Sequence, residues 1–471
     1  MSTAALPAAP ASQRRAALPP RRLTLLLMVG AIAGFAAFAL PHFLPAQPYG
    51  LADDYRVFYA ASRVLAHGGN PFDPATIHAA EQSADFYPQV QPSLDDYVNL
   101  PVVAWAMRPL TALPFWASYA VFTAAGVAAL LGAIAMLARD LGWRRRAPLL
   151  LLLVPLSWVS LLGFLSGQFD ALLLAGLVLS LRLAIRHRPA AAGALSALVW
   201  VKPDLTWPVV PLLALALWPD VRAALRLLTG FAAASAGLLL LQLATTASLL
   251  PAWWHHLTLF AGRVDRVQPD LAGLTSLLRA LPGGAGGGLT GGRTLALVAA
   301  GLALATAIAL RSARAAARGA APEPRHLVAA VCVPLALWLL VAPYAHPNDD
   351  LLLLPVVLLV LGPDAARLDG AGLRWAVLLT CAAALVWPIG LLPVAVAPLL
   401  LAVAVAGVVA GRRSPGLAGF GTAVAVLAMV LLPAVWPFHV LAYSLTPAAV
   451  LLLCAEAVIR PTAGGSAAAL L

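Results

Sequence analysis

The sequence predicts an all-α, polytopic integral membrane protein, and three observations support this. Of its 471 residues 62% are hydrophobic and 10% are charged, with a mean hydropathy of +0.90. Soluble globular proteins carry about 25% charged residues, so this chain has too little polar surface to cover a water-exposed fold. Apolar runs of roughly 17–25 residues, long enough to cross a hydrocarbon core, recur along the chain. Short arginine clusters separate these runs, as in cytoplasmic loops that follow the positive-inside rule.

We expect about 12 to 14 spans in a single transmembrane domain over residues 23–459, flanked by cytoplasmic tails at 1–22 and 460–471. The apolar stretch 23–40 exceeds the usual core of a signal peptide, so we expect it to be an uncleaved first helix. Short apolar runs indicate broken or re-entrant helices that meet inside the protein. The expected spans are 23–44, 115–138, 147–165, 170–187, 190–202, 205–218, 225–248, 293–311, 326–343, 350–362, 373–389, 393–411, 416–436 and 443–459.

Two long segments, about 45–114 and 249–292, are expected on the outer side of the membrane. With the N-terminus in the cytoplasm, most basic residues fall inside and most acidic residues fall outside, so the net charge of +11 reflects topology and not nucleic-acid binding. The three cysteines lie in apolar runs, and we find no metal-binding or nucleotide-binding motif. We therefore expect no metal and no cofactor.

The first outer segment begins with two adjacent carboxylates, Asp53 and Asp54. At the mouth of a helix, partial loss of water raises the pKa of a carboxylate towards the range of a general base, so we interpret this pair as functional. We interpret the later carboxylates of the segment, Asp73, Asp85 and Asp95, as solvated loop residues.

The second outer segment opens with Trp253 and Trp254, which we interpret as interfacial anchors. Arg263 follows within the same segment. We expect it to contact anionic lipid headgroups, with a phosphate ligand as the alternative.

Three polar breaks interrupt the apolar runs: Ser166-Gly167-Gln168-Phe169-Asp170, Lys202-Pro203-Asp204, and the string from Tyr344 to Asp350. Lys202 is the only lysine, and an ionisable group at membrane depth is a functional candidate by default. It could pair with Asp204 or Asp170, or offer its charge to a phosphate, and both interpretations stay open. Structural and functional roles are equally open for His346 and Asp350.

Taken in order, these motifs resemble glycosyltransferase family 87 of the GT-C superfamily, which includes mannosyltransferases that use polyprenol-phosphate-mannose. The chain departs from the family pattern at Val98-Asn99-Leu100-Pro101 and at Gln268-Pro269-Asp270-Leu271, which leaves the sugar and the acceptor open. The resembling motifs are Asp54-Tyr55-Arg56-Val57-Phe58-Tyr59, Gly69-Asn70-Pro71-Phe72-Asp73, Leu100-Pro101 with Arg108-Pro109-Leu110, Gly167-Gln168, Lys202-Pro203, and Pro343-Tyr344 through Asp350-Leu351.

The resemblance implies a GT-C-type domain of a bacterial inner membrane, with its active site facing the periplasm or exterior. It implies a polyprenyl-phosphate sugar donor, mannose as the expected hexose, a glycolipid, polysaccharide or protein acceptor, and inversion at the anomeric carbon. By motif position Asp54 is the general base, with Asp53 as its neighbour or substitute. The expected phosphate-binding residues are Lys202, His346, Arg263 and Gln168, and the expected supporting residues are Asp350, Asp204 and Tyr59.

A transporter or lipid flippase is the alternative function. It would place polar sites near the bilayer midplane, accessible from both sides in turn. A purely structural membrane protein would leave Lys202 unexplained.

Overall fold

The computed structural model describes residues 52–83, 97–267, 271, 274–275, 291–317 and 324–360. Within these residues every regular element is a helix, which confirms the expected all-α class. The spans expected before residue 52 and after residue 360 lie outside the described residues, as do Asp85 and Asp95.

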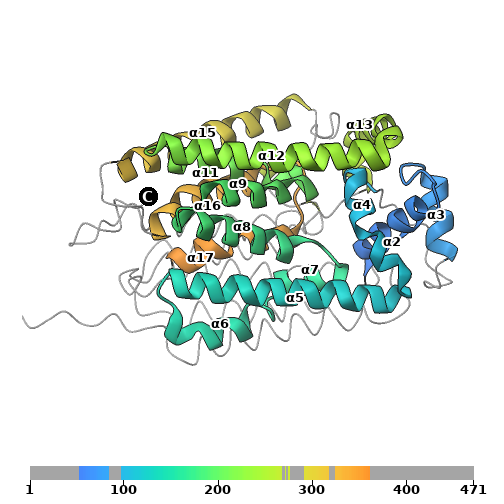
Figure 1. Ribbon diagram of the computed structural model, residues 1–471. Coiled ribbons are helices and arrows are strands. Elements are labelled where there is room, and N and C mark those ends of the chain that lie inside the picture. The colour runs from blue at the N-terminus through green and yellow to red at the C-terminus, as the bar shows by residue number, and fades with distance from the viewer. Residues whose placement is uncertain are drawn as a thin grey trace, which may run out of the picture.

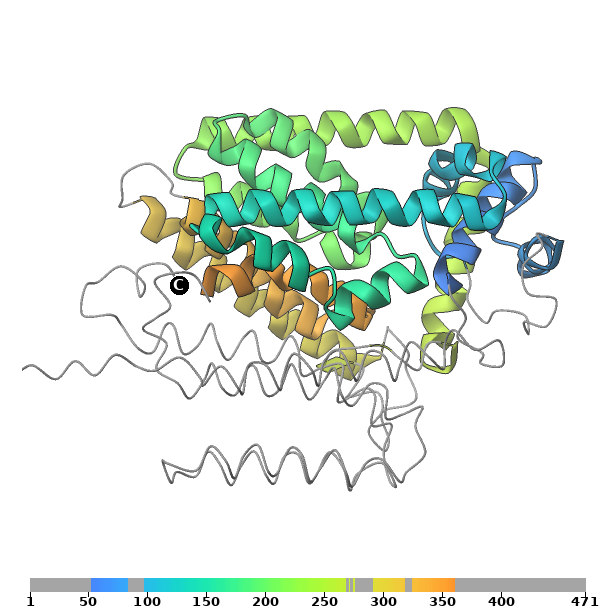
Figure 2. The same cartoon turned by 90° about the horizontal axis from the view of Figure 1, so that it is seen from below.

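Long apolar helices form the body of the molecule and lie side by side in both views (Figures 1 and 2). Among the described residues four helices are long and apolar enough to cross a membrane: α5 (Phe115–Asp140), α12 (Val221–Thr246), α15 (Gly292–Ala317) and α16 (Pro324–Val341). Together they confirm the polytopic membrane protein that the composition predicts.

The second outer segment is more helical than expected. The segment begins within a helical run, because α12 continues through η4 (Ala247–Leu249) into α13 (Leu250–Val267). Residues 221–262 form one run of 42 residues that is apolar enough to span a membrane. Pro251 does not end the run, because a proline in the first turn of a helix has no hydrogen bond to lose.

Broken helices occur where the chain has polar or proline-rich breaks. The span expected at 147–165 is divided into α6 (Ala147–Leu153) and α7 (Trp158–Ser166), and α8 (Asp170–Ile185) follows α7 at a bend of 120°. Prolines in the connections and at helix starts explain several of the breaks, since proline cannot continue a helical hydrogen-bond ladder. The other short pieces are α9 (Pro189–Ser196), η3 (Ala197–Val201), α10 (Pro203–Thr206), α11 (Val209–Leu217), η6 (Pro347–Leu353) and α17 (Leu354–Val360).

The first outer segment contains α2 (Asp53–Ala66), α3 (Pro74–Ser83), α4 (Pro101–Met107) and η1 (Arg108–Ala112). The string from Gly69 to Asp73 makes the turn between α2 and α3. The Asn70 side chain accepts a hydrogen bond from the Phe72 backbone at 3.0 Å, and the Asp73 carboxylate accepts one from the Thr76 backbone at 3.3 Å. The Thr76 hydroxyl also donates to Asp73 and lowers the pKa of its carboxyl. Asp73 thus caps α3 from the turn that precedes this helix, where its side chain is partly exposed.

The two ends of the helical body differ in charge. Helices α2, α3, α4 and α13 gather at one end, on the right of Figure 1, which we call the α2 end. Most exposed arginines of the described residues lie in the opposite ends of the helices and their connections, which we call the basic end. Two exposed arginines lie elsewhere, Arg108 in η1 and Arg293 in the first turn of α15. Those of the basic end are Arg139, Arg144, Arg145, Arg146, Arg186, Arg188, Arg222, Arg226 and Arg311.

Candidate active site

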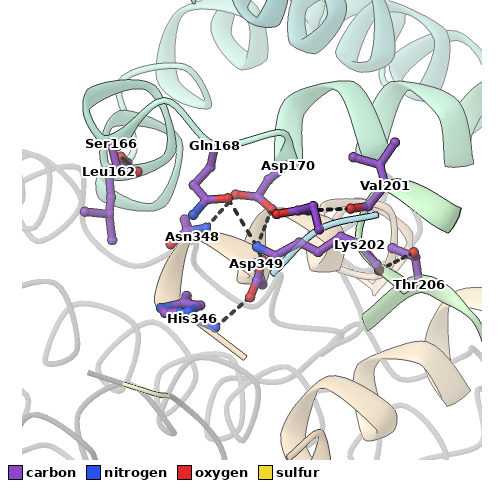
Figure 3. A network of polar contacts seen from close by, with 11 residues as sticks. Leu162, Ser166, Gln168, Asp170, Val201, Lys202, Thr206, His346, Asn348 and Asp349 are labelled. Carbon is purple, nitrogen blue, oxygen red and sulfur yellow. Dashed lines mark hydrogen bonds and ion pairs between the residues drawn. The ribbon is translucent and has the colours of Figure 1, made fainter. Parts of the chain in front are cut away.

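Three helix breaks meet around the ammonium group of Lys202 (Figure 3). Its Nζ lies 3.4 Å from Gln168 Oε1 and 3.4 Å from Asp170 Oδ1, and it also donates to Asp349 Oδ1. Asn348 Nδ2 donates to Asp170 Oδ2 at 2.6 Å. These five residues, named here the Lys202 cluster, tie together the breaks before α8, before α10 and at η6.

Backbone geometry brings the members of the Lys202 cluster together. Gly167 ends α7 in the left-handed conformation, at φ 80°, and its N–H bonds to the Gly163 carbonyl at 3.0 Å. This conformation favours glycine and turns the chain from α7 into α8. Asp349 caps η6, because its Oδ2 accepts the backbone N–H of His346 at 2.6 Å. One carboxylate therefore serves both the helix start and Lys202.

The Lys202 cluster is buried and its ammonium is saturated. Lys202 is 8% exposed, while Asp170 and Asp349 are each 1% exposed. An ammonium group has three N–H donors and no acceptor, and the three acceptors named above use all three donors. Of the interpretations left open for Lys202, the structure shows the pairing with Asp170.

Asp349 was not anticipated as a partner of Lys202. Its position in the string from Tyr344 to Asp350 drew attention to His346 and Asp350 instead. No ion pair joins Asp204 to Lys202 among the described residues. Asp204 and Asp350 each have one buried carboxylate oxygen without a hydrogen-bond partner in the described part of the chain.

The N-terminus of α2 lies against the break between α7 and α8. The Ala52 backbone N–H donates to the Leu165 carbonyl at 2.6 Å. A Cβ at Gly167 would lie only 2.4 Å from the Tyr55 Cβ, so the close approach of α2 requires glycine there. The first outer segment and the Lys202 cluster are therefore neighbours in space.

Asp53 and Asp54 face different surroundings. Asp53 Oδ1 accepts from Arg56 Nη2 at 2.7 Å, and Arg56 Nε lies 3.8 Å from the buried Glu81 carboxylate of α3. Asp54 lies one helical turn before Phe58 and so shares its face of α2. The Phe58 ring packs on Phe169, the residue after Gln168, at 4.8 Å between centroids. Asp54 thus belongs to the α2 face turned towards the Lys202 cluster.

Aromatic contacts place α13 near His346. The His346 ring meets Tyr344 edge-on at 5.0 Å, and Tyr344 packs on Phe260 of α13 at 5.6 Å. Arg263 lies three residues further along α13, and its side chain is outside the described residues.

Two aromatic side chains make hydrogen bonds that the sequence did not predict. Tyr59 donates its hydroxyl to the Leu113 carbonyl at 2.8 Å and so fastens α2 to the start of α5. Trp253 donates its indole N–H to the Val98 carbonyl at 3.0 Å. Trp254 is 62% exposed, as an interfacial anchor would be.

Comparison with known proteins gave one match. The model of glycosyltransferase family 87 matches residues 97–343. No curated protein and no solved structure matched the chain. The matched region includes Gln168, Asp170 and Lys202, whereas α2 lies before it and the string from Tyr344 to Asp350 follows directly after it.

Proposed function

Since the chain belongs to glycosyltransferase family 87, we propose that this membrane glycosyltransferase moves a hexose from a polyprenyl-phosphate donor to an envelope acceptor. Mannose is the expected sugar, and the acceptor is a glycolipid, polysaccharide or protein of a bacterial envelope. The observation that carries the proposal is the docking of α2 on the break that holds Gln168, because it brings the start of the helix that carries Asp53 and Asp54 to this break.

Asp54 is the proposed general base. Its carboxylate takes the proton of an acceptor hydroxyl as that oxygen attacks the anomeric carbon. The bond from the anomeric carbon to the phosphate oxygen breaks, its electron pair leaves with polyprenyl phosphate, and a glycosidic bond forms. Attack from the face opposite the phosphate inverts the anomeric centre. Asp53 is the weaker candidate because its carboxylate is already engaged by Arg56 at 2.7 Å.

Hydrogen-bond donors must stabilise the negative charge on the departing phosphate. Gln168 and His346 are the candidates, with Arg263 of α13 as the cation. Lys202 was expected in this group, but its three donors are taken by Gln168, Asp170 and Asp349. Lys202 therefore has no donor left for the phosphate.

The proposed face of action is the α2 end. Basic residues remain on the cytoplasmic side of multi-pass membrane proteins. Most of the exposed arginines of the described residues lie at the end opposite α2, which favours a periplasmic or exterior position for Asp54.

The decisive experiment is sugar transfer by the purified protein in proteoliposomes. Polyprenyl-phosphate-[14C]mannose is supplied with a lipid extract of the native envelope, and labelled products are separated by chromatography. We expect a labelled acceptor and release of polyprenyl phosphate. Movement of the labelled donor across the bilayer without transfer would contradict the proposal and support the flippase alternative.

A further inference from the structure

We propose that Lys202 is a positioning residue that orients the side-chain amide of Gln168 so that its NH₂ group donates to the donor phosphate. Lys202 does not bind the phosphate itself. This inference rests on the function proposed above and names the part that the only lysine plays in it.

The net charge of the Lys202 cluster is unfavourable for a phosphate. Lys202 contributes one positive charge to the cluster, while Asp170 and Asp349 contribute two negative ones, and all three are buried. A phosphate brought to this cluster would meet a net negative charge and would find no free N–H on the ammonium. The lysine is therefore poorly placed as a phosphate ligand.

The contact with Lys202 fixes the orientation of the Gln168 side-chain amide. An ammonium group can only donate, so the Gln168 atom that faces it at 3.4 Å must be the carbonyl oxygen. This fixes which side of the amide carries the oxygen and leaves the NH₂ group directed away from Lys202. Gln168 Nε2 has no hydrogen-bond partner among the residues that the structure describes.

Gln168 lies at the edge of the cluster, next to α2. Gln168 is partly exposed, whereas Asp170, Lys202, Asn348 and Asp349 are buried. Its chain neighbours contact α2, because Gly167 lies against Tyr55 and Phe169 packs on Phe58. Gln168 is thus the partly exposed member of the cluster, and it lies in the break on which α2 docks; Figure 3 shows it with Asp170 and Lys202.

The test is a double-mutant cycle between Gln168→Ala and the pair Lys202→Met with Asp349→Asn. The pair removes one positive and one negative charge, so the net charge of the cluster is unchanged. Asp170 loses its cation but keeps the hydrogen bond from Asn348. Asp349→Asn alone is the control for this background. The readouts are kcat and KM for sugar transfer, and the shift in Tm caused by polyprenyl phosphate.

If Lys202 acts through Gln168, each arm of the cycle lowers kcat/KM by about 100-fold, the effect of losing one donor to a developing anion. The variant with all three substitutions should then have a kcat/KM no lower than the less active of the two parent variants, because both remove the same hydrogen bond. Multiplied losses would overturn the inference and return Lys202 to the phosphate ligands.

A variant that keeps the Lys202 contact guards against misfolding. Gln168→Glu still accepts from Lys202 but presents oxygen where the NH₂ group was, so kcat/KM should fall as in Gln168→Ala with Tm unchanged. Full activity in Gln168→Glu would overturn the inference. A wild-type protein that polyprenyl phosphate does not stabilise would overturn both proposals, whereas an active wild type with multiplied losses would overturn the positioning role alone.

Discussion

Two adjacent carboxylates at the start of α2 have different surroundings, although the sequence presents them as equivalents. Asp53 is held by Arg56, which also approaches the buried Glu81. Asp54 shares its helix face with Phe58, whose ring touches Phe169 beside the Lys202 cluster. The structure therefore separates a residue that joins α2 to α3 from one that faces the proposed site.

Asp54→Asn should reduce sugar transfer by about 10²–10⁴-fold, the usual contribution of a general base, because the amide cannot accept the hydroxyl proton. Asp53→Asn is the matched control and should keep most of the activity. The measurement is the initial rate of transfer in proteoliposomes at equal protein content. Equal losses of activity in the two variants would contradict the assignment of Asp54 as the general base.

Gly167 is the second residue on which the site depends. It combines a positive φ with a close approach to Tyr55, and a Cβ there would lie 2.4 Å from the Tyr55 Cβ. We expect Gly167→Ala to push α2 away from the break and to lower activity strongly. Gly68 is the matched control, since it has a φ of 76° but nothing within 4 Å of its would-be Cβ.

Gly68→Ala should therefore show the cost of backbone strain alone, about 1 kcal/mol, without the activity loss. Activity and Tm of both variants are the measurements. If the two glycine variants behave alike, the contact with Tyr55 does not matter for function.

At the scale of elements, small residues allow helices to pack closely. A Cβ at Gly193 of α9 would lie 1.9 Å from the Leu227 carbonyl oxygen of α12, and a Cβ at Gly230 would lie 2.0 Å from the Ala190 carbonyl oxygen. Close backbone contact through glycine is a common way for helices to associate in membranes. It brings α9, and the Lys202 break that follows it, to a defined place against α12.

Gly230→Ala should destabilise the protein by about 1–3 kcal/mol, the cost of overpacking. Gly237→Ala, also on α12, should be neutral or stabilising, because nothing lies within 4 Å of its would-be Cβ and alanine favours a helix. Unfolding in detergent monitored by circular dichroism distinguishes the two. A harmless Gly230→Ala would contradict the close packing of α9 on α12.

At the scale of the whole molecule, charge divides the two ends of the helical body. Exposed arginines mark the basic end, and α2, α3, α4 and α13 form the other (Figure 1). This polarity agrees with a cytoplasmic basic end and an outward-facing Asp54.

In a variant without native cysteines, Gln82→Cys in α3 should react with a membrane-impermeant maleimide in intact cells. Arg145→Cys at the basic end should react only after the membrane is permeabilised. Both residues are exposed, so burial does not confound the comparison. Labelling with the opposite pattern would invert the topology and contradict the proposed outer face.

Composition and pattern were enough to predict the membrane-spanning helices and to identify the three polar breaks. The sequence carries this information locally, because the length of an apolar run decides whether it can cross a bilayer, and proline, glycine and ionisable residues mark where a helix stops. Locally helical turns inside the outer segments were missed, since polar helices lack the long apolar signal on which the prediction relied.

Only the tertiary structure decided which polar groups meet. Lys202 binds Asp349, 147 residues away in the chain, and no local pattern encodes such a pairing. The sequence determined that Lys202 needs a partner, because a charge at membrane depth is costly when unpaired. Helix packing determined that its partners are Asp170, Asp349 and Gln168, and that the start of α2 docks on the break before Asp170.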